Sequence, residues 1–188
     1  VQSAEFLSKN KFGAIIAVER SVGLRDAIET GEPLNADVSA HLINAIFWPS
    51  SPLHDMGVVI RQGRILAASV QFPLAEPGEM HDHHLGTRHR AAVGLTKVTD
   101  ALVVVVSEET GTISLAENGR LTRTLSPAAL DRDLTARLAD TPIEPEEAPL
   151  DQPTPDQALA ALETDTAIIN ASPNKPTKPK KPKVKAVQ

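Results

Sequence analysis

The chain has 188 residues, of which 41% are hydrophobic and only 3% aromatic, with a formal net charge of −5 and no cysteine. This acidic balance argues against a general nucleic-acid-binding protein, and the lack of cysteine excludes disulfides, thiol catalysis and thiolate metal sites. The lack of cysteine also fits a reducing compartment. No apolar stretch approaches the roughly 20 residues that a membrane-spanning helix needs. Because the sequence begins with Val1 rather than Met, we expect a longer parent protein, which could carry a membrane tether.

Apolar runs and helical patterns alternate up to about residue 140. Short apolar runs, most of them β-branched, predict strands at residues 13–18, 57–60, 65–72, 101–106 and 112–116. Helical patterns predict a helix that is capped by Asn35 or Asp37 and ends at Phe47, a second over residues 88–98, and a third that Ser126 caps and that ends at Leu138. This interleaving predicts an α/β fold, in which helices flank a central mixed β-sheet.

Residues 141–188 differ in composition from the rest of the chain. Residues 141–165 are rich in Pro, Glu and Asp without a basic residue, and residues 171–188 set six lysines among prolines. Neither part offers enough apolar surface to offset the entropy of ordering, so we expect a disordered tail with at most a short helix at residues 156–162. The lysines favour a solubilising tail; an arm that contacts anionic lipid or nucleic acid is the alternative.

Three polar clusters lie where predicted strands or helices begin or end, the usual place for ligand sites in α/β proteins. The first is His54 and Asp55, just before the strand at residues 57–60. A neighbouring His and Asp can hold a divalent cation, and a carboxylate can accept a proton from a hydroxyl nucleophile. Taken alone, an Asp at this position is more typical of a turn or a cap.

The second cluster follows Gly86 at the start of a predicted helix and consists of Thr87, Arg88, His89 and Arg90. Backbone N–H groups at a helix start favour anions, and arginine adds permanently charged donors that suit phosphate. A solvated helix face would also explain two arginines, but the combination favours a phosphate site.

The third cluster, Ser107, Glu108 and Glu109, ends the run ALVVVV, the strongest predicted strand. Its carboxylates could support a metal directly or through water. On its own, this cluster is more typical of an acidic turn.

The segments SPLHDMGVVI, LGTRHRAAVG and VVSEETGTISLAENG, in this order, closely resemble the diadenylate cyclase (DAC) domain. The resemblance runs from about Phe6 to about Leu121 and includes FGAIIAVER near the start of the chain. It is closest to the CdaA-like branch, in which the catalytic domain follows membrane helices. It implies the DAC fold, a catalytic domain over residues 1–140, and the joining of two ATP molecules into cyclic di-AMP with release of pyrophosphate.

The resemblance also implies roles for the three clusters. Asp55 corresponds to the catalytic carboxylate, and the expected ligands of Mg²⁺ or Mn²⁺ are His54, Asp55 and Glu108; an imidazole ligand favours Mn²⁺. The residues expected to act on the triphosphate are Arg88, His89 and Arg90 as catalytic groups, together with Thr87, Ser107 and Glu108. Gly57 is expected to give the nucleotide room, and Leu53 and Phe72 either line the adenine pocket or belong to the core.

The expected reaction needs two bound ATP molecules, each of which acts as nucleophile and as electrophile. One domain binds one ATP, so we expect a face-to-face homodimer with two-fold symmetry. ATP is then the expected partner and nucleic acid is not. We expect a cytoplasmic catalytic domain, anchored to the membrane if the parent protein carries a tether.

Three alternatives stay open. The family's Asp-Gly-Ala motif reads Asp55-Met56-Gly57 here, and Met56 in place of glycine could leave a nucleotide sensor with little turnover. A second alternative is a zinc hydrolase that uses His81, His83 and His84, although a stretch between Pro77 and Gly86 favours exposed histidines. A third is an interaction protein that works through its charged tail.

Overall fold

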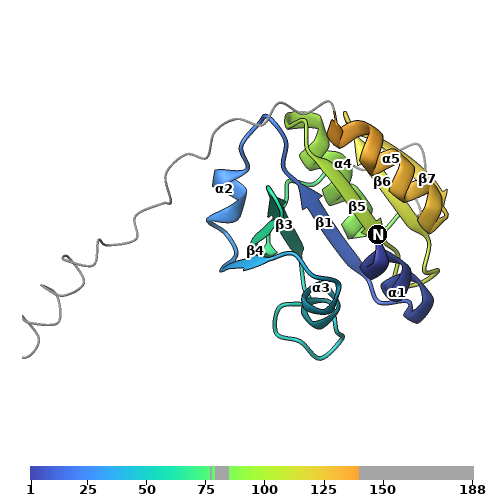
Figure 1. The fold of residues 1–188 in the computed structure, drawn as a ribbon. Helices are drawn as coiled ribbons and strands as arrows, with labels where there is room; N and C mark the ends of the chain where they lie inside the picture. The colour runs from blue at the N-terminus through green and yellow to red at the C-terminus, as the bar shows by residue number, and fades with distance from the viewer. Residues whose placement is uncertain (77, 79–84, 140–188) are drawn as a thin grey trace, which may run out of the picture. The chain divides into compact units, whose positions relative to one another are not determined.

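The centre of the fold is a seven-stranded sheet in the order β2-β4-β3-β1-β5-β6-β7 (Figure 1). The computed structural model describes residues 1–76, 78 and 85–139. The strands are β1 (Ala14–Val18), β2 (Glu32–Asp37), β3 (Gly57–Arg61), β4 (Arg64–Val70), β5 (Leu102–Val106), β6 (Ile113–Glu117) and β7 (Arg120–Leu125). The helices are α1 (Gln2–Asn10), α2 (Arg25–Ile28), α3 (Ala40–Ile46), α4 (Thr87–Val98) and α5 (Pro127–Ala139).

The sheet is mixed: β1 and β3 run parallel, whereas the other neighbouring strands pair antiparallel. The predicted α/β fold with a central mixed sheet is therefore confirmed. The predicted disorder of residues 141–188, the short helix at 156–162 and the three histidines 81, 83 and 84 lie outside the described residues.

Helices cover both faces of the sheet. Side chains of successive strand residues point to opposite faces, so the apolar residues of each strand need packing partners on both faces. Alternate residues of β1 and β5 pack on one face with buried residues of α1, α3 and α5, including Leu7, Ile46 and Leu130. The intervening strand residues pack on the other face with Ala92 and Leu95 of α4 and with α2. The result is a layer of helices on each side of the sheet, with β5 buried along its whole length (Figure 1).

The predicted strands on either side of residues 61–64 form a hairpin as expected. Its two central residues have left-handed backbone angles, with φ of 46° at Gln62 and 77° at Gly63. Two consecutive residues with positive φ are the mark of a type I′ turn, whose twist matches that of the strands it joins.

The helix predicted to start at Asn35 or Asp37 was placed too early. Residues 32–37 form strand β2, which pairs with β4, and α3 begins at Ala40. Ser39 is the cap, because its hydroxyl oxygen accepts a hydrogen bond from the backbone N–H of Leu42 at 3.1 Å. At the last helix the expected cap is confirmed: the Ser126 hydroxyl accepts from Ala129 N–H at 3.2 Å.

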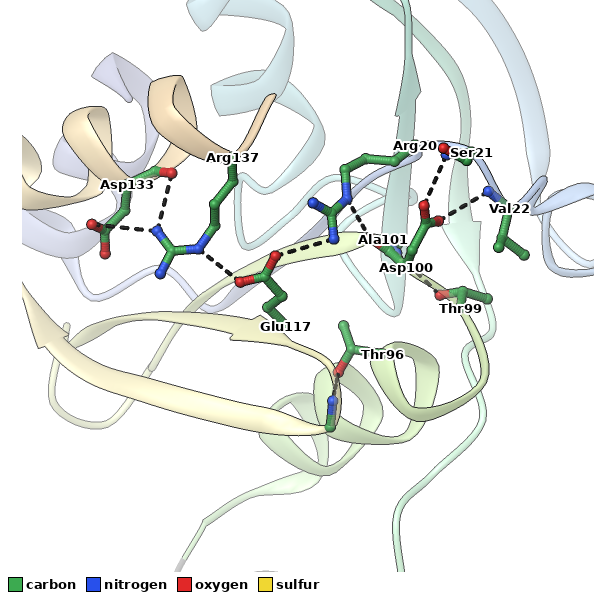
Figure 2. Close-up of polar contacts among 11 residues, drawn as sticks. Arg20, Ser21, Val22, Thr96, Thr99, Asp100, Ala101, Glu117, Asp133 and Arg137 are labelled. Atoms are coloured by element: carbon green, nitrogen blue, oxygen red, sulfur yellow. Dashed lines mark hydrogen bonds and ion pairs between the residues drawn. The ribbon is translucent and has the colours of Figure 1, made fainter. Parts of the chain in front are cut away.

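A network of charged side chains joins α5 to one end of the sheet (Figure 2). Glu117 at the end of β6 accepts hydrogen bonds from Arg20 at 3.1 Å and from Arg137 of α5 at 2.7 Å. Asp100, before β5, accepts from the backbone N–H groups of Ser21 and Val22 at 3.0 and 2.9 Å. These contacts tie the segment after β1, the segment before β5 and the end of β6 to the last helix.

No described helix is both long and apolar enough to cross a membrane.

Candidate functional site

The first and third polar clusters lie at the same end of the sheet, on either side of β1. Ala14 pairs with Val106 of β5, and Ile16 pairs with Val58 of the parallel strand β3. Because β1 and β3 run parallel, the segment that precedes β3 lies at the same end of the sheet as Ala14. Because neighbouring strands are about 4.8 Å apart, the backbone before β3 and the end of β5 are about 10 Å apart.

The second and third clusters line one cavity, which has a volume of about 190 Å³. The predicted site residues among its lining are Thr87, Arg88, His89, Ser107, Glu108 and Glu109. The cavity is also lined by Arg123 of β7, which belongs to none of the three polar clusters. The N-terminus of α4 and the end of β5 therefore form a shared site.

A larger cavity, of about 440 Å³, lies near the opposite end of the sheet. It is lined by Arg120 and by the Glu117 and Arg137 pair of the charged network. None of the predicted site residues lines it, and its Arg137 and Glu117 are already hydrogen-bonded to each other. We therefore treat the smaller cavity as the candidate site.

Arg88 and Glu108 form an ion pair in the candidate site, with 2.5 Å between Arg88 Nη1 and Glu108 Oε2. The Arg88 side chain is 23% exposed and that of Glu108 63%. Arg88 Nε is buried and has no hydrogen-bond partner in the described part of the chain. A buried, charged donor without a partner suits an anionic oxygen such as that of a phosphate.

The first turn of α4 adds backbone donors to the cavity. Gly86 is its N-terminal cap residue, and among the described residues no side chain caps this turn. Uncapped N–H groups and the helix dipole give this end a partial positive charge, which favours an anion. His89 lines the cavity as a mostly buried side chain, 7% exposed.

Arg90 does not line this cavity. Its Nε donates a hydrogen bond to the Ala75 carbonyl at 3.0 Å, and Ala75 N–H donates to the Arg90 carbonyl at 3.0 Å. Arg90 thus fastens α4 to the segment that follows β4.

His54 and Asp55 adopt an arrangement that fits a divalent cation. His54 Nδ1 lies 2.6 Å from the carbonyl oxygen of Ser51, which only accepts, so Nδ1 carries the proton. In the neutral imidazole the lone pair is then on Nε2, which lies 3.5 Å from Asp55 Oδ1. A backbone carbonyl that fixes the tautomer of a histidine in this way is common at metal sites.

The three predicted metal ligands do not lie together, because Glu108 is not grouped with His54 and Asp55. Within the described ranges, no three His, Asp or Glu side chains lie close enough together to hold a metal ion. Glu108 instead pairs with Arg88. The protein side chains at the candidate metal position are therefore His54 and Asp55.

Met56 and Gly57 both occupy positions with requirements that glycine usually meets: a left-handed backbone at Met56 and close packing at Gly57. Met56 has a left-handed backbone with φ of 63°, and its side chain is 52% exposed. A Cβ on Gly57 would lie 2.2 Å from Phe72 Cε2. Phe72 is buried in the core beside α4, and Leu53 packs on the core of the opposite face. Neither lines the cavity, which favours the core interpretation for both.

The model of the DAC family, described as DisA bacterial checkpoint controller nucleotide-binding, matches residues 1–121. The chain belongs to the DAC family. Its DAC domain is 47% identical over 135 residues to "Cyclic di-AMP synthase CdaA" of Bacillus subtilis (strain 168), a match that covers 72% of this chain and 49% of the relative. It is 44% identical over 137 residues to "Diadenylate cyclase" of Listeria monocytogenes serotype 1/2a (strain 10403S), covering 73% and 50%.

Solved structures share the DAC fold. A double mutant of DacA from Staphylococcus aureus matches with a TM-score of 0.70 and 39% identity, over 73% of this chain and 91% of that one. A protein of Bacillus cereus, described as a hypothetical membrane spanning protein, matches with a TM-score of 0.63 and 46% identity, over 66% and 60%. The recognised resemblance to a CdaA-like DAC domain is therefore confirmed. The chain spans about half the length of the curated relatives CdaA and diadenylate cyclase.

Proposed function

We propose that this DAC domain is the catalytic part of a diadenylate cyclase, which joins two ATP molecules into cyclic di-AMP and releases two pyrophosphates. The observation that carries the proposal is the cavity shared by α4 and the end of β5, where Arg88 Nε is buried without a partner among the described residues. Guanidinium and helix N–H donors together suit a polyphosphate. The relatives named as cyclic di-AMP synthase and diadenylate cyclase support the same reaction.

Each of the two steps is a phosphoryl transfer. The 3′-oxygen of one ATP forms a bond to the α-phosphorus of the other, the bond from that phosphorus to the bridging oxygen breaks, and pyrophosphate leaves with that oxygen. We assign the hydroxyl proton to the carboxylate of Asp55, whose side chain is 76% exposed and accessible to substrate. Arg88 and His89 stabilise the charge on the phosphates, and Thr87 and Ser107 add hydrogen bonds.

We assign a divalent cation, Mg²⁺ or Mn²⁺, to His54 and Asp55. Bound there, such a hard cation offsets the negative charge on the phosphate oxygens. The imidazole favours Mn²⁺, because nitrogen is a softer ligand than oxygen. Two protein side chains, those of His54 and Asp55, would hold the cation at this position. We assign Glu108 to the ion pair with Arg88, next to the phosphates.

Two ATP molecules must react with each other, and the cavity fits one polyphosphate. We therefore propose that two copies of the domain face each other during catalysis, each with one ATP. An isolated copy is then expected to bind ATP without forming product.

Chromatographic detection of cyclic di-AMP from ATP tests the proposal. With Mn²⁺ or Mg²⁺, we expect product, and a rate per molecule of protein that falls on dilution. A rate per molecule that stays constant on dilution contradicts the facing pair, and a folded protein that forms no product with either cation contradicts the cyclase. Asp55→Asn should lose at least about 100-fold in rate, since it removes the proton acceptor and one of the two side chains assigned to the cation.

A nucleotide sensor with little turnover is the second candidate function. The strained backbone of Met56, next to Asp55, favours it, because a glycine would adopt φ of 63° freely. If Met56→Gly forms cyclic di-AMP and the natural sequence binds ATP without forming it, the sensor is the correct function.

We also propose that the parent protein holds this domain at the cytoplasmic side of a membrane, where ATP is available. Two observations support this: the chain spans about half of its curated relatives, and the similar Bacillus cereus protein is described as membrane spanning. Fractionation of cells that express the full-length protein tests it, and a parent found only in the soluble fraction contradicts it.

A further inference from the structure

Arg123 lies at the candidate site although it belongs to none of the three polar clusters and falls beyond the residues that the family model matches. It is an exposed residue of β7, the strand at the edge of the sheet. The register brings it to the cavity. Leu125 pairs with Ile113, and Ile113 pairs with Val106, so the last residues of β7 lie at the sheet end where β5 enters the site.

Arg123 changes the balance of charge in the lining of the cavity. The lining contains two guanidinium groups, of Arg88 and Arg123, and two carboxylates, of Glu108 and Glu109. Arg88 Nη1 pairs with Glu108, so these two residues together add no net charge to the lining. Without Arg123, one guanidinium group would face two carboxylates in the lining, and this balance would weaken the attraction for a polyphosphate.

The order of the strands assigns Arg123 to one end of the polyphosphate. Asp55 precedes β3, and β7 is four strands further along the sheet, about 19 Å away at the usual strand spacing. Arg88 and Glu108 lie between them, beside β1 and β5. If the reacting α-phosphate faces the Asp55 side, the β- and γ-phosphates extend towards β7.

We infer that Arg123 binds the β- and γ-phosphates of ATP, the part that leaves as pyrophosphate, and so makes the site prefer ATP over nucleotides with fewer phosphates. The inference rests on the proposed function of the same site. Arginine suits this role because its charge is permanent and its donors match phosphate oxygens in pairs.

The matched control is Arg120, on the same strand. It is also exposed, but it pairs with Glu117 in the register and lines the larger cavity at the other end of the sheet. Arg120→Ala therefore removes the same charge from the same strand without changing the candidate site.

Calorimetric titration with a non-hydrolysable ATP analogue, inorganic pyrophosphate and AMP, each with Mg²⁺, tests the inference. We expect Arg123→Ala to weaken the analogue and pyrophosphate about 5- to 20-fold and to leave AMP within about twofold, because one charged hydrogen-bonding group is lost. Arg123→Lys should recover part of the loss, and Arg120→Ala should match the natural sequence.

Unchanged binding of pyrophosphate by Arg123→Ala overturns the inference, as does an equal loss for AMP, which would indicate a structural role. The synthesis of cyclic di-AMP by the natural sequence is measured separately. If the natural sequence forms no product but Arg123→Ala loses affinity for pyrophosphate, the inference about Arg123 stands and the proposed cyclase activity is refuted.

Discussion

The guanidinium group of Arg88 lies directly over the backbone of Gly13. A Cβ added to Gly13 would come within 2.6 Å of Arg88 Nη1 and within 2.8 Å of Glu108 Oε2. Gly13, the residue just before β1, therefore lies directly against the ion pair of the candidate site. Any side chain at this position would displace both Arg88 and Glu108.

Gly13→Ala should weaken ATP binding while the fold persists. The atoms that the new methyl group meets are the ends of flexible side chains, so we expect the free energy of unfolding to change by less than about 1 kcal/mol. The affinity for a non-hydrolysable ATP analogue should fall about tenfold, because Arg88 moves. Gly23→Ala is the control, since no atom lies within 4 Å of its added Cβ. Equal affinities in the two variants would show that Gly13 does not position the pair.

Met56→Gly should stabilise the domain. A left-handed backbone costs a residue with a Cβ about 1 to 2 kcal/mol, and the added freedom of glycine in the unfolded chain takes back part of the gain. We expect a net gain of about 0.5 to 1 kcal/mol in urea denaturation. Met56→Ala keeps the Cβ and should show no gain. If both variants behave alike, the strain does not reside in the backbone of Met56.

Gly57→Ala should destabilise the domain, because its methyl group would meet the buried ring of Phe72 at 2.2 Å. Overpacking of this kind costs about 1 to 3 kcal/mol, which chemical denaturation measures. The double variant Gly57→Ala with Phe72→Leu should lose less than the sum of the two single variants, since the smaller side chain makes room. Strictly additive losses would contradict a direct contact.

Glu117→Gln should loosen α5 from the sheet, because Arg20 and Arg137 both donate to this carboxylate (Figure 2). The hydrogen bond to Glu117 is the largest cause that raises the pKa of Arg137 above its ordinary value, against the effect of burial. A raised pKa gives stability that is present at lower pH and lost only as the pH passes the pKa of arginine. We therefore expect a loss of about 1 to 2 kcal/mol that is constant between about pH 6 and 9.

Asp133→Asn is the comparison for this network. Its carboxylate lies 3.3 Å from Arg137 Nη1 one helical turn away, and such a pair contributes only about 0.3 to 0.5 kcal/mol. A loss for Glu117→Gln no larger than that for Asp133→Asn would contradict the bridging role of Glu117.

The sequence predicted the strands that consist of apolar runs, because burial on both faces needs such runs. It did not predict β2, a short strand at the edge of the sheet in which only Leu34 and Ala36 are partly buried, between the exposed residues Pro33, Asn35 and Asp37. Those residues are extended because they pair with β4, and pairing between distant segments leaves no local signal.

The candidate site shows the same division. Thr87, Arg88 and Ser107 could be predicted because they lie in motifs at element ends, and the cavity brings them together. Arg123 could not, because it lies in the polar segment RLTRTL and reaches the cavity only through the register of β6 and β7. The pairing of Glu108 with Arg88 also depends on tertiary contacts between α4 and the end of β5.

The most direct measurement is a crystal structure of the domain with a non-hydrolysable ATP analogue and Mn²⁺. We predict that the phosphates lie in the cavity of about 190 Å³ in contact with Arg88 Nε, and that the cation is bound by His54 Nε2 and Asp55. A nucleotide bound elsewhere, or a cation that leaves His54 and Asp55 without contact to it, would contradict the account.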